Sequence, residues 1–261
     1  MAILIATVVI AAIGLLIGYG LVEAGKKFHV DTDERVSQVR ELLPGNNCGA
    51  CGFAGCDAVA EAIVSGAADV NACPVNSAEN QNKIGWIMGQ TAEAPKKRTA
   101  FVHCTGDCSH TRLKFNYVGI EDCRAAVGAG LSPWSCDYGC IGLGSCAKVC
   151  QYGAISVQDG VAVVDSKKCI GCGMCAKACP KGLIEVMVDG NKFAVRCTNH
   201  DRGADVMKVC DAGCIGCTLC TKQCEVQAIA MDANLARINK ELCVGCGKCA
   251  EKCPKKVITH I

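Results

Sequence analysis

The sequence is poor in residues that usually build an enzyme's core and active site. Aromatic residues make up 4% of the 261 residues, and the chain has only 6 prolines and 5 histidines. It has no G-x-G-x-x-G fingerprint for dinucleotides, no phosphate-binding P-loop and no visible Ser–His–Asp arrangement. We therefore expect no catalytic residues, no NAD site and no nucleic-acid site on this chain. Of the scattered histidines, only His103 adjoins a candidate ligand, because it precedes Cys104.

Charge is absent from the beginning of the chain. Residues 2–22 contain no Asp, Glu, Lys or Arg, and about 20 apolar residues suffice to cross a bilayer as a helix. A cleaved signal peptide would have a basic start and a shorter apolar run, and a buried soluble helix is the other alternative. Lys26, Lys27 and Arg35 follow the run. The positive-inside rule therefore predicts a single-pass helix in the plasma membrane, with the N-terminus outside and the rest in the cytoplasm.

Cysteine is unusually frequent, with 25 residues in the chain. Runs such as C-x2-C-x2-C cannot easily pair with themselves as disulfides, and their spacing matches metal ligands. Free thiolates need a reducing compartment, in agreement with a cytoplasmic location. Because aromatics are few and glycines number 29, we expect bound metal to replace part of the hydrophobic core.

Two stretches, beginning at Cys169 and Cys243, follow C-x2-C-x2-C-x3-C-P. Bacterial ferredoxins hold [4Fe–4S] clusters with this run, and its fourth cysteine ligates the neighbouring cluster. Each run has partner cysteines upstream. For the second run, this crossover predicts one cluster on Cys214, Cys217, Cys220 and Cys253, and another on Cys224, Cys243, Cys246 and Cys249.

The two runs belong to two copies of one unit, at residues 99–190 and 191–261. Cys136-Asp-Tyr-Gly-Cys140 matches Cys210-Asp-Ala-Gly-Cys214, and Val-His-Cys104-Thr matches Val-Arg-Cys197-Thr. Such internal repeats indicate a modular array. Asp159-Gly160 predicts a hairpin turn in the first copy, and residues 228–238 predict a strand, a turn and a strand in the second.

The first copy departs from the ferredoxin pattern in its upstream half. Its downstream cluster is predicted on Cys150, Cys169, Cys172 and Cys175. Upstream, the middle cysteine is missing between Cys140 and Cys146, and Cys136 is the nearest substitute. The predicted set is therefore Cys136, Cys140, Cys146 and Cys179. Five cysteines remain, namely Cys104, Cys108, Cys123, Cys197 and Cys210. Four of them could hold a sixth cluster, or some of them could be free buried thiols.

A separate set of four cysteines lies nearer the N-terminus. The stretch Asn-Cys48-Gly-Ala-Cys51-Gly-Phe-Ala-Gly-Cys56 is followed by an apolar periodic stretch and then by Cys73. A helix over 57–65 would bring Cys73 back to the loop. Four thiolates also suit zinc, but the glycine-rich loop and the ferredoxin runs favour a cluster.

This order of segments resembles the B subunit of the Rnf complex, in its long polyferredoxin form, over nearly the whole chain. The Asn-Cys-Gly-Ala-Cys-Gly-Phe-Ala-Gly-Cys stretch after a single apolar segment is its most specific sign. The resemblance implies an electron-transfer subunit of an ion-translocating ferredoxin:NAD oxidoreductase. Such a subunit takes electrons from soluble ferredoxin and passes them through [4Fe–4S] clusters to membrane subunits, while another subunit handles NAD. Its partners would be ferredoxin, membrane and peripheral subunits, and membrane lipid.

Two other classes of function stay open. A membrane-anchored polyferredoxin could serve a different oxidoreductase, and a structural zinc protein could use the same thiols. The expected fold class is α+β, with a transmembrane helix, a small 4Fe-4S module and two tandem ferredoxin-like modules. The expected segments are a transmembrane helix at 1–22, a stem at 23–40, the 4Fe-4S module at 41–90, a linker at 91–98, and the two copies at 99–190 and 191–261.

Overall fold

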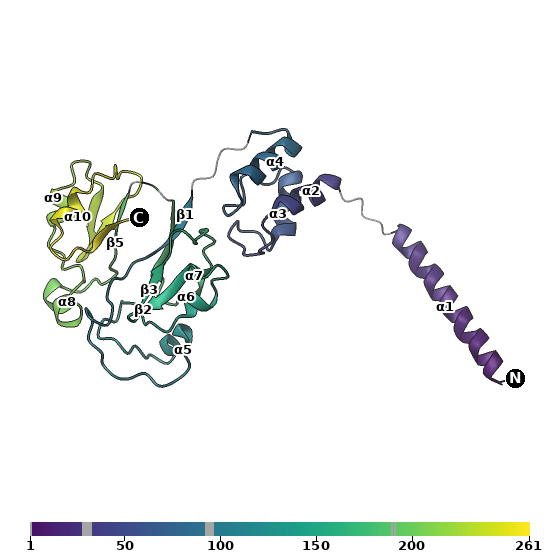
Figure 1. Ribbon diagram of the computed structural model, residues 1–261, viewed down its shortest axis with the longest axis horizontal. Helices are drawn as coiled ribbons and strands as arrows, with labels where there is room; N and C mark the ends of the chain where they lie inside the picture. The colour runs from purple at the N-terminus through teal and green to yellow at the C-terminus, as the bar shows by residue number, and fades with distance from the viewer. Residues whose placement is uncertain (1, 28–32, 92–96, 189, 191) are drawn as a thin grey trace.

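The computed structural model describes residues 2–27, 33–91, 97–188, 190 and 192–261. The predicted linker lies mostly outside these residues. Figure 1 shows a long N-terminal helix, a small group of helices and a larger part built from short strands and helices. The chain thus mixes helices with strands, as expected for an α+β protein.

The N-terminal helix α1 covers Ala2–Lys27. Its side chains are described for residues 11–23, where the larger apolar ones are exposed, Leu15 to 77%. Among the residues that the structure describes, none of the helices has the length and apolar character needed to cross a membrane. The predicted span at 2–22 includes side chains outside the described part, and it stays a prediction.

Three helices form the part of the chain that carries the first four cysteines. We call this part the N-terminal cysteine module; it covers residues 34–90. Asp33 caps the first helix by accepting from the Arg35 backbone N–H, and Ser77 caps the last by accepting from the Asn80 N–H. The second helix confirms the one predicted over 57–65. The helices are α2 (Glu34–Leu42), α3 (Cys56–Val64) and α4 (Ala78–Met88). Their shared core includes Val39, Val59, Ile63 and Ile84.

The first copy consists of two antiparallel strand pairs and three short helices. An outer pair joins the beginning and the end of the copy, and an inner hairpin lies between them in sequence. Asp159 and Gly160, at the hairpin turn, have φ of 47° and 80°, as a two-residue Asp-Gly turn requires. The outer pair is β1 (Arg98–Val102) with β4 (Ile184–Val188), and the hairpin is β2 (Ile155–Gln158) with β3 (Val161–Val164). The helices are α5 (Cys123–Gly128), α6 (Ser145–Lys148) and α7 (Met174–Ala178).

The second copy repeats this plan, so the duplication in the sequence is also a duplication in structure. The predicted strand–turn–strand at 228–238 is confirmed as its inner hairpin. The outer pair is β5 (Phe193–Val195) with β8 (Ile258–His260), and the hairpin is β6 (Ile229–Asp232) with β7 (Leu235–Ile238). The helices are α8 (Gly203–Val209), α9 (Leu219–Lys222) and α10 (Lys248–Lys252).

The core of each copy is made largely of cysteines and short aliphatic side chains. In the second copy, the fully buried Leu235 lies in one cluster with buried cysteines from both ferredoxin-type runs. The core members of the second copy are Val195, Cys197, Cys214, Cys220, Ile229, Leu235, Ala236, Cys249, Cys253, Val257 and Ile258. Five of these eleven core residues are cysteines, so we expect the stability of this core to depend on what the cysteines hold.

Reciprocal hydrogen bonds join the two copies. His103 Nδ1 lies 2.8 Å from the Val195 carbonyl oxygen, and Arg196 Nε donates to the Val102 carbonyl over 3.3 Å. Because a carbonyl only accepts, Nδ1 of His103 carries the proton. His103 and Arg196 occupy equivalent places, each directly before a cysteine. The same position in each copy therefore reaches across to the strand of the other.

Candidate metal centres

The second copy carries two sets of four cysteines, each around its own cavity. Cys214, Cys217, Cys220 and Cys253 line one of them, and Cys224, Cys243, Cys246 and Cys249 line the other. In each set, three cysteines come from one run and the fourth from the other run. The structure therefore brings together the groups that the crossover pattern predicts.

The downstream set of the first copy is also brought together. Burial, together with the neighbouring Cys169, Cys172 and Cys150, raises the pKa of Cys175 to about 11. The Ala100 backbone N–H donates to Cys169 Sγ over 3.3 Å, so the outer strand β1 contacts this set directly.

The upstream set of the first copy differs from the prediction. Cys140, Cys146 and Cys179 line one cavity together with Cys123, and Cys136 is not among its lining residues. Cys123 begins α5, and its N–H donates to the Ser145 hydroxyl over 2.6 Å, directly before Cys146 in α6. Nearness in sequence thus pointed to Cys136, whereas the fold brings Cys123 to this place. The sequence held no spacing signal for Cys123, because a long loop separates it from Cys140.

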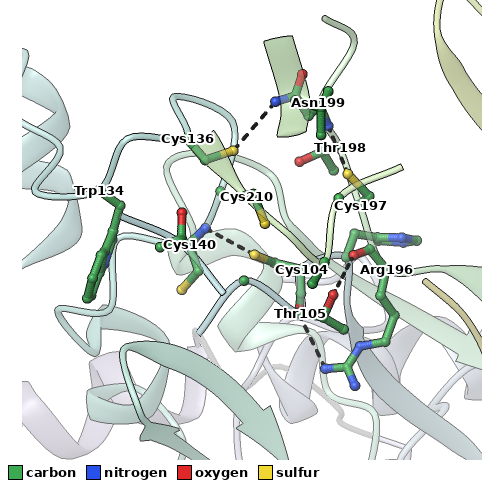
Figure 2. A pocket seen from close by; sticks show the side chains of 17 residues that line it. Cys104, Thr105, Trp134, Cys136, Cys140, Arg196, Cys197, Thr198, Asn199 and Cys210 are labelled. Atoms are coloured by element: carbon green, nitrogen blue, oxygen red, sulfur yellow. Dashed lines mark hydrogen bonds between the residues drawn. The ribbon is translucent and has the colours of Figure 1, made fainter. Parts of the chain in front are cut away.

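Cys136 instead lies at a cavity between the two copies. Figure 2 shows the side chains of Cys104, Cys136, Cys197 and Cys210 directed toward one another there. Cys104 and Cys197 are equivalent in the two copies, and so are Cys136 and Cys210. We call these four cysteines the bridging thiols.

The cysteines of the N-terminal cysteine module also lie together. Burial raises the pKa of Cys73, and the nearby Cys51, Cys48 and Cys56 add to this effect. The Asn47 side-chain oxygen accepts from the Cys56 N–H over 2.7 Å, which ties the glycine-rich loop to the start of α3.

This module contacts the first copy at its downstream set. Lys177 Nζ donates to the Gly49 carbonyl over 3.3 Å, and Asn46 Nδ2 donates to the Tyr152 hydroxyl. Burial raises the pKa of Cys172, and Cys48 of the module is one of the thiols that raise it further. The sets around Cys48 and Cys172 are therefore neighbours.

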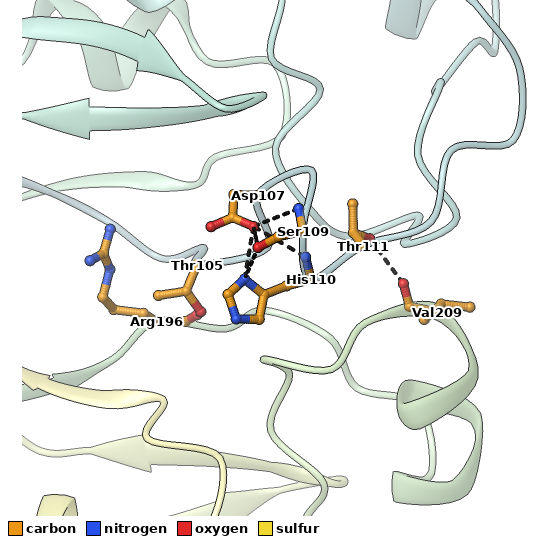
Figure 3. A network of polar contacts seen from close by, with 7 residues as sticks. All are labelled: Thr105, Asp107, Ser109, His110, Thr111, Arg196 and Val209. Atoms are coloured by element: carbon orange, nitrogen blue, oxygen red, sulfur yellow. Dashed lines mark hydrogen bonds and ion pairs between the residues drawn. The ribbon is translucent and has the colours of Figure 1, made fainter.

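Cys108 is the one cysteine of the described chain that falls in none of these sets, and it is exposed. The loop that carries it is fixed by Asp107, which accepts from the Ser109 and His110 backbone N–H groups and from the Ser109 hydroxyl (Figure 3). The Ser109 hydrogen bond, with that of His110, lowers the pKa of Asp107 to about 2. The Cys108 N–H itself donates to the Asp159 carbonyl over 2.7 Å. The loop thus holds Cys108 apart from the other thiols.

Burial and hydrogen bonding act in opposite directions on the thiols, because burial favours the protonated thiol and N–H donors favour anionic sulfur. Burial raises the pKa of Cys140 to about 12 and those of Cys146 and Cys220 to about 11. A metal must therefore displace protons from them when it binds. Backbone N–H groups donate to sulfur at equivalent places in the copies, from Ala154 to Cys150 over 3.3 Å and from Ala228 to Cys224 over 3.2 Å.

The four thiols of each set, the N–H donors and the glycine-rich loops fit a [4Fe–4S] cluster. Two of these loops pass very close to other backbone. A Cβ on Gly142 would lie 2.5 Å from the Gly160 carbonyl oxygen, and a Cβ on Gly216 would lie 2.8 Å from the Asn234 carbonyl oxygen. Across the described residues, no three or more His, Cys, Asp or Glu side chains form a group that could hold a single metal ion.

Fold and thiol sets together define a tandem ferredoxin-type iron–sulfur protein. Models of known families agree with this class. Residues 43–75 match a family described as "Putative Fe-S cluster", and residues 138–183 and 207–260 each match a "4Fe-4S dicluster domain". None of these matches includes Cys104, Cys123, Cys136 or Cys197.

Curated relatives cover nearly the whole chain. The B subunit of the ion-translocating oxidoreductase complex of Methanosarcina acetivorans is 44% identical over 96% of this chain and 95% of its own length. The B subunit of the Na⁺-translocating ferredoxin:NAD⁺ oxidoreductase complex of Acetobacterium woodii is 40% identical, over 91% of this chain and 72% of its own. The B subunit of the proton-translocating complex of Clostridium ljungdahlii is 40% identical, over 90% and 84%. The chain belongs to the family of B subunits of ion-translocating oxidoreductase complexes, which confirms the predicted resemblance.

Proposed function

We propose that this chain is the electron-transfer subunit of a membrane-bound, ion-translocating ferredoxin:NAD oxidoreductase. The observation that carries the proposal is the match to such subunits over at least nine-tenths of the chain, combined with cysteines gathered in sets of four. The clusters, when bound, would supply one-electron transfer at low potential.

The residues proposed to hold clusters form five sets besides the bridging thiols. The sets are Cys48, Cys51, Cys56 and Cys73; Cys150, Cys169, Cys172 and Cys175; Cys123, Cys140, Cys146 and Cys179; Cys214, Cys217, Cys220 and Cys253; and Cys224, Cys243, Cys246 and Cys249. In the third set, Cys123 replaces the Cys136 that sequence spacing favoured.

The protein around these sets insulates and tunes them. N–H groups that donate to sulfur favour the more negative, reduced form of a cluster and so raise its potential. Burial of the thiols keeps water away from the clusters and favours electron transfer to a neighbouring cluster over reaction with molecules in solvent. We propose that α1 anchors the chain in the membrane, that NAD is handled by another subunit, and that electrons arrive from soluble ferredoxin.

The lysines beside the two complete cysteine runs differ in their hydrogen-bond partners and therefore in their availability to an incoming ferredoxin. Lys177 and Lys181 of the first copy donate to backbone carbonyls of distant segments, Lys177 to that of Gly49 in the N-terminal cysteine module. In the second copy, Lys252 and Lys256 are exposed beside the last run, and Lys256 donates to the Glu251 carbonyl of that same run. Because this end of the second copy is open to solvent, we propose that ferredoxin, an acidic carrier, docks there.

The experiment is anaerobic purification of the full chain in detergent, followed by mixing with reduced ferredoxin. The proposal expects bleaching of the iron–sulfur absorbance and new electron paramagnetic resonance signals, with no NADH formed by this chain alone. A protein that contains zinc in place of iron would overturn the electron-transfer role. Clusters that chemical reductants reduce but ferredoxin does not would instead favour a polyferredoxin for another oxidoreductase.

A further inference from the structure

Five cysteines line the cavity between the two copies. One of them, Cys140, also lines the cavity of the upstream set of the first copy, and the other four come from parts of the chain outside the two complete ferredoxin runs. Cys104 and Cys136 come from the first copy, Cys197 and Cys210 from the second. Burial, together with the neighbouring Cys136 and Cys104, raises the pKa of Cys210 to about 11. Burial raises that of Cys197 likewise, with Cys136 among its neighbours. Each copy thus supplies two equivalent thiols to one place.

Donors point at these sulfur atoms as they do in the other sets. The buried Asn199 directs its backbone N–H at Cys197 Sγ over 3.5 Å and its side-chain amide at Cys136 Sγ over 3.7 Å. Asn199 is only 2% exposed, and a buried amide needs a partner. These donors favour anionic sulfur on both sides of the cavity.

Small residues and one positive charge complete the surroundings. A Cβ on Gly106 would lie 3.3 Å from Cys210 Sγ, and one on Gly139 would lie 3.5 Å from Cys136 Sγ. Arg196 is partly buried, and its Nη2 donates to the Cys104 carbonyl over 3.4 Å. A four-thiolate cluster carries net negative charge, which this guanidinium would offset.

The cavity lies between the upstream set of the first copy and the upstream set of the second copy. The Cys140 N–H donates to Cys104 Sγ over 3.5 Å, and the equivalent Cys214 N–H donates to Cys197 Sγ over 3.4 Å. Cys140 belongs to the upstream set of the first copy and Cys214 to that of the second. One hydrogen bond therefore links the bridging thiols to a ligand of the set on either side.

We infer that Cys104, Cys136, Cys197 and Cys210 bind a sixth [4Fe–4S] cluster that connects the two copies. This inference rests on the proposed electron-transfer function. A cluster held by these four thiols would take up one electron from the set on one side and pass one to the set on the other, so its oxidation state would be restored in each passage. Cys123 and Cys108, the other cysteines outside the predicted sets, take no part in it.

Metal analysis of the full chain tests this inference without reference to activity. We expect about 24 irons and as many acid-labile sulfides per wild-type chain, because each cube holds four of each. Cys136→Ala and Cys197→Ala should each retain about 20 irons, while the matched control Cys108→Ala keeps the wild-type content. The reduced wild type should also show magnetic coupling between clusters that weakens in the two variants.

Other results would overturn it. About 20 irons in the wild type, unchanged in Cys136→Ala, would mean that the bridging thiols are free. One zinc per chain that disappears in Cys136→Ala would mean a zinc site. The wild-type iron and zinc contents decide the question even if the variants do not fold. Six clusters that ferredoxin cannot reduce would leave the site intact and contradict only the proposed function.

Discussion

Arg196 places a positive charge beside the bridging thiols. Burial lowers the pKa of its guanidinium, and the nearby Cys104 opposes this effect. The ring of Phe101 lies 5.8 Å from its central carbon, so packing fixes the group in place as well. In the first copy, His103 stands at the equivalent position, so the two copies place different side chains next to this site.

Removing this charge should lower the reduction potential of the bridging cluster. A nearby cation stabilises the more negative, reduced state, and its loss corresponds to a shift on the order of 50 mV. We expect this shift in Arg196→Gln, measured by redox titration followed by electron paramagnetic resonance. Lys208→Gln, which removes an exposed charge paired with Asp205, is the control. Equal titrations of the two variants would show that Arg196 does not act on a cluster.

Cys123 and Cys136 can be separated by combining their substitutions. If they serve different clusters, the losses add, and Cys123→Ala with Cys136→Ala should lose about eight irons, against about four in each single variant. If Cys136 completes the upstream set of the first copy, the double variant should lose no more than either single one. Iron content per chain, with the polypeptide quantified by amino-acid analysis, distinguishes the two cases.

At the scale of elements, the upstream ligand loop of each copy is fitted closely against the hairpin of that copy. Gly142 lies at φ 82°, and a Cβ there would meet the carbonyl of Gly160 in the turn between β2 and β3. Gly216 meets the carbonyl of Asn234 in the second copy in the same way. Contact with the hairpin turn therefore restricts the conformation of the cysteine loop in each copy.

Gly142→Ala should weaken the first copy more than Gly182→Ala does. Both glycines have positive φ, so each alanine costs about 1–2 kcal/mol in backbone strain. Only at Gly142 does the new Cβ also meet backbone, at 2.5 Å, whereas Gly182 has no atom within 4 Å. We expect iron–sulfur absorbance to be lost several degrees lower in Gly142→Ala than in Gly182→Ala. Equal temperatures would mean that the loop moves away from the turn without cost.

Elements with a local signal were predictable from the sequence. The Asp159-Gly160 turn fixed the hairpin of the first copy, and the two complete ferredoxin runs identified their own crossover partners. The place of Cys123 and the full membership of the bridging thiols were not predictable, because their sets are completed by contacts across long loops or between copies. The five candidates for a sixth set included Cys104, Cys197 and Cys210, together with Cys108 and Cys123, but they lacked Cys136, which spacing had assigned elsewhere.

Over the whole molecule, the thiol sets follow one another from the N-terminal cysteine module to the end of the second copy. Hydrogen bonds or shared electrostatics link the set of Cys48 to that of Cys172, and the bridging thiols to Cys140 and Cys214. The N-terminal cysteine module covers part of the first copy at Lys177. This order leaves the last set of the second copy as the outer end.

Charge reversal at that end should slow the reaction with ferredoxin. Lys252→Glu combined with Lys256→Glu should lower the rate of reduction roughly 10-fold or more at low salt, and the difference should shrink as salt screens the charges. Lys167→Glu with Lys168→Glu, exposed in the first copy, is the matched control. Stopped-flow absorbance gives both rates. A larger effect in the control pair would place the docking surface on the first copy.

The bridging thiols also have a consequence for biosynthesis. The sets of the N-terminal cysteine module and of the first copy are complete once residue 179 has been made, whereas the bridging site also needs Cys197 and Cys210. During translation, the first copy can therefore receive its own clusters before the second copy exists. The connecting cluster can be inserted only after the chain has passed Cys210. A nascent chain that stalls before this point therefore lacks the cluster that passes electrons between the first copy and the second.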